Sequence, residues 1–257
     1  MKATVIEELK KVELKNPILI EGFPGLGMVG SIATNYLVKQ LKAEKLGTLY
    51  SPHFPYHVIV SKDGGARLLS GELYYWKNET GENDLILLTG DSQAQTIEGQ
   101  FEVANSILDF AEQKNVKSII TIGGYRNEVE GAPKVVAVST SSELFDQALK
   151  AKAVDSEAGT PIVGTAGLLL GLAKFHDLEA LCLLGETRGY LPDPKTAKKI
   201  IEVLKGVLGF TVDLKGLDEE IEKAKEILGR MQDIEKRRAK YVMNMRKVEE
   251  ERITYIS

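Results

Sequence analysis

The 257-residue chain is 43% hydrophobic and 27% charged, which provides enough apolar material for one large domain or two small ones. Its 33 Lys and Arg against 37 Asp and Glu give a net charge of −4, which offers no electrostatic basis for binding nucleic acid or an anionic membrane. Cys182 is the single cysteine, so an intramolecular disulfide and a cysteine-rich zinc site are excluded.

Other features of the composition favour an intracellular protein. The three histidines (His53, His57 and His176) include no pair at a metal-ligand spacing, so no metal site is predicted. The first twenty residues mix charges too evenly for a signal peptide. No apolar run approaches the ~20 residues that span a bilayer. The sequence therefore predicts a cytoplasmic protein that binds neither membrane nor nucleic acid.

Strand-like apolar runs alternate with helical patterns as far as residue 210. The predicted strands are 18–20, 46–51, 57–61, 66–77, 84–89, 118–122, 134–139, 161–164 and 180–184, and the predicted helices are 28–41, 95–114, 142–150 and 194–208. In the 95–114 helix, Ile97, Phe101, Ala104, Leu108 and Ala111 share one apolar face. A small apolar helix or loop is expected at 166–174. Apolar strands separated by helices are typical of a mostly parallel sheet covered on both faces. The predicted fold is an α/β three-layer sandwich spanning domain 1–212.

The last forty-five residues, 213–257, are predicted to form a second domain, a helical arm and tail. From Leu217 to about Glu250 the chain lacks proline and is rich in Glu, Lys and Arg. Its apolar residues begin with heptad spacing, and the spacing resumes at Tyr241, Met245 and Val248. A helix of ~34 residues would be ~50 Å long. It would either fold back on its own sheet or pack against another subunit or partner.

A glycine motif follows the first predicted strand. Residues 25–30, GLGMVG, satisfy G-x-G-x-x-G between a strand and a helix. A dinucleotide site also needs an acidic residue at the end of the second strand, and the 46–51 run ends without one. We interpret the glycines as residues that permit a tight turn and close packing of helix on strand, and we predict no cofactor.

Polar residues follow several predicted strands, where an open α/β sheet would bind a ligand. They are Glu21, Asp91, Arg126, Glu186 and Arg188. The arginines could bind a phosphate or carboxylate, and the carboxylates could act as acids or bases. None stands in a recognised catalytic spacing, so no catalytic residue is predicted. Cys182 lies in an apolar strand and is expected in the core. The alternative is a phosphorylase- or hydrolase-like enzyme acting on a nucleoside or phosphorylated metabolite at this edge.

Four stretches together resemble the proteasome assembly chaperone 2 family, over residues 15–210. They are EGFPGLGMVG (21–30), LTGDSQ (88–93), TIGGY (121–125) and GETRGYLPDP (185–194). The length and the predicted C-terminal helix are most similar to the archaeal members. The resemblance implies a phosphorylase-like α/β sandwich and a non-enzymatic role as chaperone or activator of the 20S proteasome. It also implies a homo-oligomer, with 20S α-subunits or a paralogous family member as partners.

The resemblance also gives the C-terminus a role. Proteasome-binding tails often end in a hydrophobic residue, a tyrosine and one final residue. This chain ends Thr254-Tyr255-Ile256-Ser257, so its tyrosine is third from the end. One residue of extended chain moves the terminal carboxylate by ~3.3 Å relative to such a tail. The predicted partner-binding residues are Tyr241, Met245, Val248, Ile253, Tyr255 and Ile256.

Overall fold

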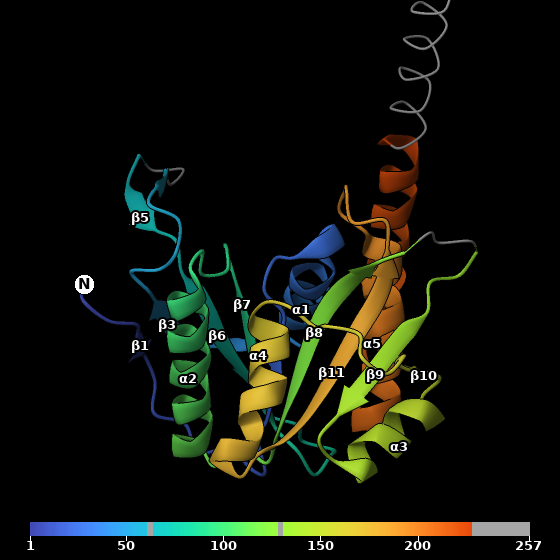
Figure 1. Cartoon of the computed structure of the whole chain (residues 1–257), viewed down its shortest axis with the longest axis horizontal. Coiled ribbons are helices and arrows are strands. Elements are labelled where there is room, and N and C mark those ends of the chain that lie inside the picture. Colours follow the sequence, from blue (N-terminus) through green and yellow to red (C-terminus); the bar gives the residue numbers. More distant parts are fainter. Residues whose placement is uncertain (61–63, 128–130, 228–257) are drawn as a thin grey trace, which may run out of the picture. The chain divides into compact units, whose positions relative to one another are not determined.

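The computed structural model describes residues 1–60, 64–127 and 131–227 (Figure 1). The chain divides into two compact units, Met1–Leu214 and Lys215–Ser257. In the second unit, residues 215–227 are helical, and the rest of the predicted arm lies outside the described residues. The α/β body belongs to the first unit, to which the rest of this section refers.

The described residues place nine strands in one mixed sheet. In spatial order they are β1 (Val5–Glu8), β3 (Glu44–Tyr50), β6 (Gly71–Trp76), β7 (Leu85–Gly90), β2 (Ile18–Glu21), β8 (Ser118–Arg126), β11 (Glu179–Thr187), β9 (Val135–Ser139) and β10 (Val154–Asp155). The four central strands β7, β2, β8 and β11 are parallel. On one side β6, β3 and β1 pair antiparallel in turn, and on the other β9 runs antiparallel to β11.

Helices cover both faces of this sheet, which confirms the predicted three-layer α/β fold. They are α1 (Val29–Gln40), α2 (Ile97–Gln113), α3 (Ser142–Lys150), α4 (Thr165–Leu172) and α5 (Pro194–Leu208). The pair α2 and α4 packs together on the face toward the viewer in Figure 1. Behind the sheet, α5 packs against both α1 and α3. Among the described residues no helix is both long and apolar enough to cross a membrane.

Side-chain caps fix where several helices begin. The Thr96 hydroxyl accepts a hydrogen bond from the Gly99 N–H at the start of α2, and Asp193 accepts one from the Thr196 N–H at the start of α5. Pro194 occupies the first turn of α5, where its missing N–H costs nothing. The same helix ends at Gly209, which takes the left-handed conformation (φ 70°) that glycine adopts without strain.

The core between the sheet and α2 explains why the central strands are almost wholly apolar. Leu19 of β2, Ile119 of β8 and Cys182 of β11 are fully buried there, against Val103 and Ile107 of α2. Burial raises the pKa of the Cys182 thiol to about 12, so this cysteine is a core residue as predicted. Burial of each of the four aliphatic side chains, Leu19, Ile119, Val103 and Ile107, stabilises the fold by roughly 1.5–3 kcal/mol relative to exposure.

The structure departs from the sequence prediction in four places. One is the edge strand β1, which was not predicted and pairs with β3. The 66–77 run is two strands, because β5 (Ala66–Leu68) leaves the main sheet to pair with β4 (Val58–Val60) in a separate hairpin. The strand predicted at 161–164 is wrong, because this segment ends at Gly164 (φ 85°), the residue that caps α4. The sheet ends instead in β10, which pairs with β9.

Candidate functional site at the carboxyl edge of the sheet

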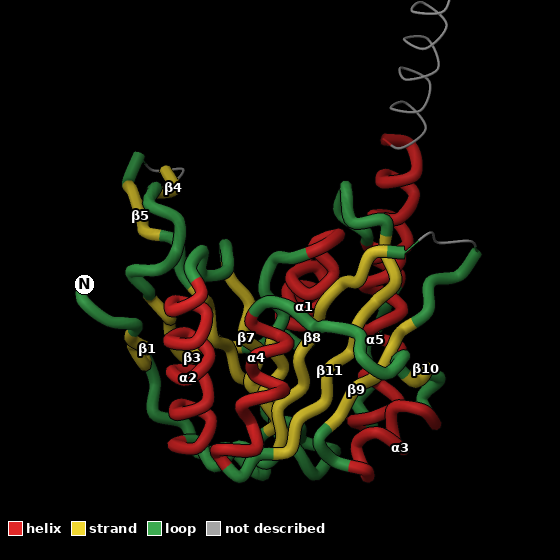
Figure 2. Tube along the Cα trace, viewed as in Figure 1, coloured by secondary structure: helices red, strands yellow, loops and turns green. Residues whose placement is uncertain are grey.

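The loops that follow the four parallel strands meet at one edge of the sheet, as the chain trace in Figure 2 shows. The strands are direct neighbours, so their carboxyl ends bring together segments that are far apart in sequence. Glu21 ends β2, Arg126 ends β8, Asp91 follows β7 and Arg188 follows β11. The prediction that these residues gather at one edge is therefore correct, although their contacts differ from those of a catalytic site.

The glycine motif lies directly on the strand ends. Gly27 has a φ of 61°, and a Cβ at this position would lie 2.6 Å from the Thr187 hydroxyl of β11. A Cβ at Gly30 would lie 2.6 Å from the Ile122 carbonyl oxygen of β8. Real Cβ atoms do not come so close, so the backbone can pack here only without side chains. The interpretation as close-packing residues is confirmed for Gly27 and Gly30, whereas a Cβ at Gly25 would come no closer than 3.6 Å to its nearest neighbour.

Hydrogen bonds join the other sequence stretches to this glycine loop. The Gln93 side-chain amide donates to the Pro24 carbonyl (2.9 Å), and its oxygen accepts from the Thr165 N–H at the start of α4 (3.0 Å). The Asp193 N–H donates to the Gly27 carbonyl (2.8 Å). All four stretches that carry the family resemblance therefore meet around residues 22–30.

Asp91 acts as an anchor for the β4–β5 hairpin. Its carboxylate accepts hydrogen bonds from both terminal nitrogens of Arg67 in β5, at 2.6 and 2.9 Å, and from the Ser70 N–H at 3.0 Å. The Arg67 guanidinium holds the pKa of Asp91 below its ordinary value. Both carboxylate oxygens are thus committed to positioning the hairpin.

The other charged groups also make local contacts. The buried Glu186 accepts hydrogen bonds from the Asn127 side chain (2.6 Å) and the Lys134 N–H (3.0 Å). The guanidinium of Arg126 lies over the Tyr190 ring, 4.8 Å from its centroid, and Arg188 is exposed. In the described part of the chain, no hydrogen bond or ion pair joins the members of the predicted set to one another.

Glu21 has a different environment. Its side chain is only 1% exposed, and one carboxyl oxygen accepts a hydrogen bond from the Phe23 N–H (2.9 Å). The second oxygen, Oε2, has no partner among the described residues. Burial raises the pKa of this carboxyl to about 8, so at neutral pH it is mostly protonated and uncharged.

The β4–β5 hairpin carries exposed apolar residues that the sequence analysis did not single out. We call Tyr56, Val58, Val60 and Leu68 the hairpin patch; the Tyr56 side chain is fully exposed, and Val60 is 73% exposed. Such clusters often mark protein-binding surfaces. The sequence predicted both strands as parts of the α/β body and did not predict a separate hairpin.

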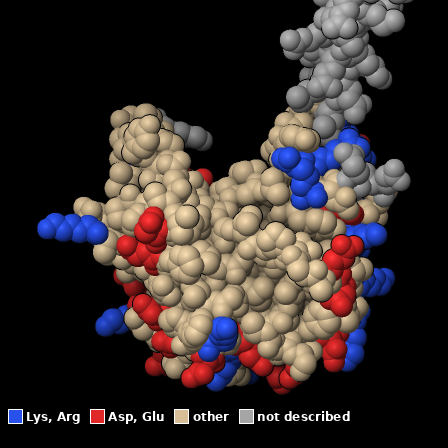
Figure 3. Space-filling view, in the orientation of Figure 1, with Lys and Arg blue, Asp and Glu red and all other residues tan. Residues whose placement is uncertain are grey.

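Helix α4 and the residues next to it form another surface of low charge. This helix has no charged residue, and the exposed side chains of Val163 and Phe175 flank it. Figure 3 shows that charged side chains lie mainly around the margin of this face. The predicted partner-binding residues Tyr241, Met245, Val248, Ile253, Tyr255 and Ile256 all lie outside the described residues.

The architecture defines a three-layer α/β protein. The four sequence stretches described above pack together at the carboxyl edge of its sheet. Residues 19–232 match the model of the PAC2 family, and the chain belongs to this family. It is 32% identical over 231 residues to the uncharacterised protein MJ1210 of Methanocaldococcus jannaschii, a match that covers 86% of this chain and 88% of that protein.

Two solved structures from Pyrococcus furiosus are similar to this one. PbaB, described as an archaeal proteasome activator, is 38% identical with a TM-score of 0.86, and the match covers 90% of this chain and all of PbaB. PbaA, described as an archaeal homologue of proteasome-assembly chaperone, is 28% identical with a TM-score of 0.75, and the match covers both chains completely. The fold and the family expected from the sequence are therefore confirmed.

Proposed function

We propose that this protein is a non-enzymatic proteasome-interacting protein of the assembly-chaperone type. The observation that carries the proposal is the similarity to PbaB, a proteasome activator, in both sequence and fold over nine-tenths of the chain. The specific partners would be 20S proteasome α-subunits or a paralogous family member.

The chemistry of the carboxyl edge supports a binding role. Asp91 and Glu186 use their carboxylate oxygens in bonds to Arg67, Asn127 and backbone N–H groups. These bonds give both carboxylates a structural role: Asp91 holds the β4–β5 hairpin, and Glu186 links Asn127 to Lys134.

Binding through the C-terminal segment is the second part of the proposal. Tyr241, Met245, Val248, Ile253, Tyr255 and Ile256 would supply apolar and aromatic anchors, the residue types that carry most of the energy of protein interfaces. In a homo-oligomer, several identical tails would bind one target and gain avidity from their linkage.

Light scattering of the purified protein, alone and with 20S proteasome, tests the proposal. A closed oligomer that shifts to a larger complex on mixing is the expected result. An oligomer that does not bind the proteasome would indicate a paralogous family member as the partner. A monomer that does not bind the proteasome would contradict the proposal.

A pair of tyrosine variants then locates the contact. Tyr255→Ala is expected to weaken the complex while leaving the oligomer and its melting temperature unchanged, because it removes an anchor in the tail. Tyr56→Ala, which removes the fully exposed tyrosine of the hairpin patch just before β4, is the matched control. If only Tyr56→Ala weakens binding, the hairpin is the contact surface and the tail assignment is wrong.

The alternative, a phosphorylase- or hydrolase-like enzyme, draws on Arg126 and Arg188 at the same edge. A thermal-shift screen with phosphate, nucleosides and nucleotides distinguishes it. A specific ligand at 100 times its Kd would stabilise the protein by ~2.7 kcal/mol. A reproducible shift that Arg126→Ala abolishes would favour the enzyme.

A further inference from the structure

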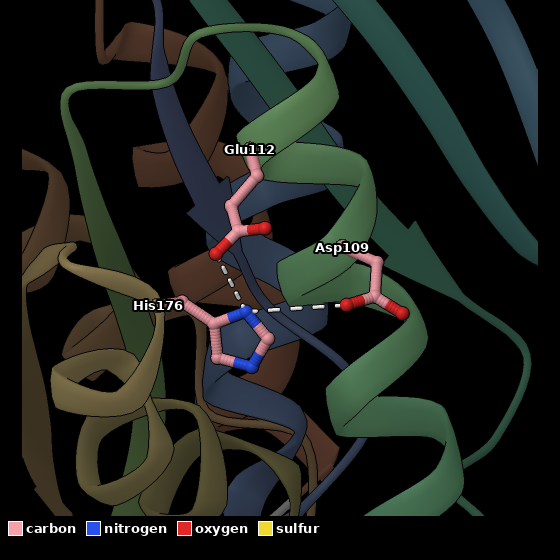
Figure 4. Close-up of side chains that lie close together, drawn as sticks. All are labelled: Asp109, Glu112 and His176. Carbon is pink, nitrogen blue, oxygen red and sulfur yellow. Dashed lines mark hydrogen bonds and ion pairs between the residues drawn. The ribbon is translucent and has the colours of Figure 1, made fainter.

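Three potential metal ligands come together at the opposite end of the body from the glycine loop. Asp109 and Glu112 lie in the last turns of α2, and His176 ends the short 3-10 helix η2 (Ala173–His176) after α4. Since α2 runs back from the end of β7 to the start of β8, its C-terminus is at the amino edge of the sheet. Figure 4 shows both carboxylates directed at the imidazole.

The donor atoms are close enough to share one ion. The His176 Nδ1 atom lies 2.9 Å from Glu112 Oε1 and 3.9 Å from Asp109 Oδ1, and all three ligand atoms lie within 4.8 Å of one another. Zinc binds nitrogen and carboxylate oxygen at ~2.0–2.2 Å, so neighbouring donors around it are roughly 3 Å apart. Glu112 and His176 already have this separation. Asp109 needs a small side-chain rotation, which its 62% exposure permits.

The electrostatics of α2 at this point favour a cation. The C-terminus of a helix carries a partial negative charge, which carboxylates in the last turn increase. The last turn of α2 contains no basic residue. The following residue, Lys114, is engaged elsewhere, because its ammonium pairs with Glu8 and lies over the Phe110 ring.

The imidazole is held in place by its own turn. Asp177 takes the left-handed conformation (φ 52°) and its N–H bonds to the Ala173 carbonyl, which ends η2 directly after His176. The His176 side chain is only 16% exposed. The nearby Lys174 ammonium lies over the Phe175 ring, 4.9 Å from its centroid. The histidine is therefore more constrained than the two carboxylates that face it.

We propose that Asp109, Glu112 and His176 bind a divalent first-row transition metal ion, with water completing its coordination. Imidazole with carboxylates suits Zn²⁺, Co²⁺ or Mn²⁺, whereas Mg²⁺ and Ca²⁺ prefer oxygen ligands alone. The ion would replace the His176–Glu112 hydrogen bond with a stronger link between α2 and η2. This inference is independent of the proposed proteasome role.

A second histidine in the same protein provides a contrast. His53 Nε2 pairs with Glu102 Oε2 at 3.1 Å, and the other oxygen of Glu102 accepts from the Thr4 N–H at 2.6 Å. In the described part of the chain, Glu102 alone pairs its carboxylate with this imidazole, so the two form a simple pair.

Calorimetric titration and thermal melts of the chelator-treated, full-length protein test the site, with Zn²⁺ as the probe and Mg²⁺ as the contrast. One Zn²⁺ per chain and a higher melting temperature are expected, with no shift from Mg²⁺ at the same concentration. Visible spectra of the Co²⁺ form would report nitrogen and oxygen coordination. Failure to bind Zn²⁺, or binding only at millimolar concentration, would overturn the proposal.

Single substitutions assign the ligands. His176→Ala, Asp109→Asn and Glu112→Gln should each weaken Zn²⁺ binding by more than ~10-fold, since even loss of an outer partner of a ligand costs at least that much. His57→Ala, which removes an exposed histidine outside the cluster, should bind Zn²⁺ like the parent. The two exposed carboxylate variants keep the test valid if His176→Ala fails to fold. Equal affinity in all four variants would show adventitious binding only and would refute the site.

Discussion

At the scale of single residues, the most unusual side chain is the buried carboxyl of Glu21. It sits at the end of a central strand with one oxygen bonded to the Phe23 N–H and the other without a partner among the described residues. A charged group in this place would lack the solvation that water gives it, and this cost is the physical reason for the raised pKa.

Glu21→Gln should remove a pH dependence of stability. The carboxyl titrates near pH 4.5 when unfolded and near pH 8 when folded, so between these values the folded state binds more protons. The free energy of unfolding of the parent should therefore fall as pH rises through this window, by at most ~1.4 kcal/mol per pH unit, and level off above pH 8. Denaturant titrations of the parent and of Glu21→Gln at pH 5, 6.5 and 8 measure the free energy of unfolding. If it changes with pH in the same way in both proteins, Glu21 is not the group responsible.

Asp91→Asn should loosen the hairpin without unfolding the body, because the charged bonds from Asp91 to Arg67 are lost. Hydrogen exchange at Val58–Val60 and Ala66–Leu68 should become faster while β7 keeps its protection. The folded pKa of Asp91 lies below 3.8, so its ion pair is complete at neutral pH and is lost as pH falls through the folded value. The control is Glu44→Gln, which breaks the exposed ion pair between Glu44 of β3 and Lys10 and should leave the hairpin unaffected.

Sequence reasoning predicted where these residues lie but not which groups they contact. Polar residues after apolar strands indicated the carboxyl edge, and this followed from the geometry of parallel sheets. The partner of Asp91 is Arg67, on a hairpin that the sequence analysis placed inside the main sheet. The proximity of Asp109 and Glu112 to His176 was not predicted, because both carboxylates come from α2, more than sixty residues earlier in the chain.

At the scale of elements, local patterns predicted the strands and helices well because each central strand is an uninterrupted apolar run. The face of α2 was predicted less well. Ala104, Leu108 and Ala111 are buried as expected, whereas Ile97 is 76% exposed and Phe101 is 43% exposed. Gly99 and Val103 are buried in the same turns, so the buried face of α2 reaches its first turn, and Ile97 and Phe101 lie at the edge of that face.

Two helical glycines should respond oppositely to alanine. A Cβ at Gly30 of α1 would meet the Ile122 backbone, whereas a Cβ at Gly171 of α4 meets nothing within 4 Å. Gly30→Ala should destabilise the protein by ~1–3 kcal/mol through overpacking. Gly171→Ala should stabilise it by ~0.5–1 kcal/mol, because alanine loses less backbone entropy in a helix. Thermal unfolding of both variants checks this; a loss of stability in Gly171→Ala would contradict it.

At the scale of the whole molecule, the two units have different compositions. The α/β body, Met1–Leu214, contains the large core cluster, which is made of residues between Leu19 and Leu184. The C-terminal unit is dominated by Glu, Lys and Arg, with apolar residues at heptad spacing. The composition shift near residue 213 was visible in the sequence because the Gly- and apolar-rich pattern ends there.

Truncation after Ile227 should separate folding from binding. The core cluster remains whole in the shortened chain, so its melting temperature should shift by less than ~4 °C, the change that about 1 kcal/mol produces in a domain of this size. Complex formation with the 20S proteasome should be lost with the proposed tail. Scanning calorimetry and light scattering measure the two effects; a truncated protein that still binds would place the contact on the body.

The glycine loop also determines what a match to the family signature can reveal. All four stretches meet where a strand end, a backbone turn and a helix start leave no room for a Cβ or need a side-chain hydrogen bond. These four stretches therefore carry information about how the strand ends pack against the glycine loop, and little about what the surface of the protein binds. Substitutions in the exposed hairpin patch, which lies outside these stretches, would alter the surface of the protein without disturbing the packing around the glycine loop.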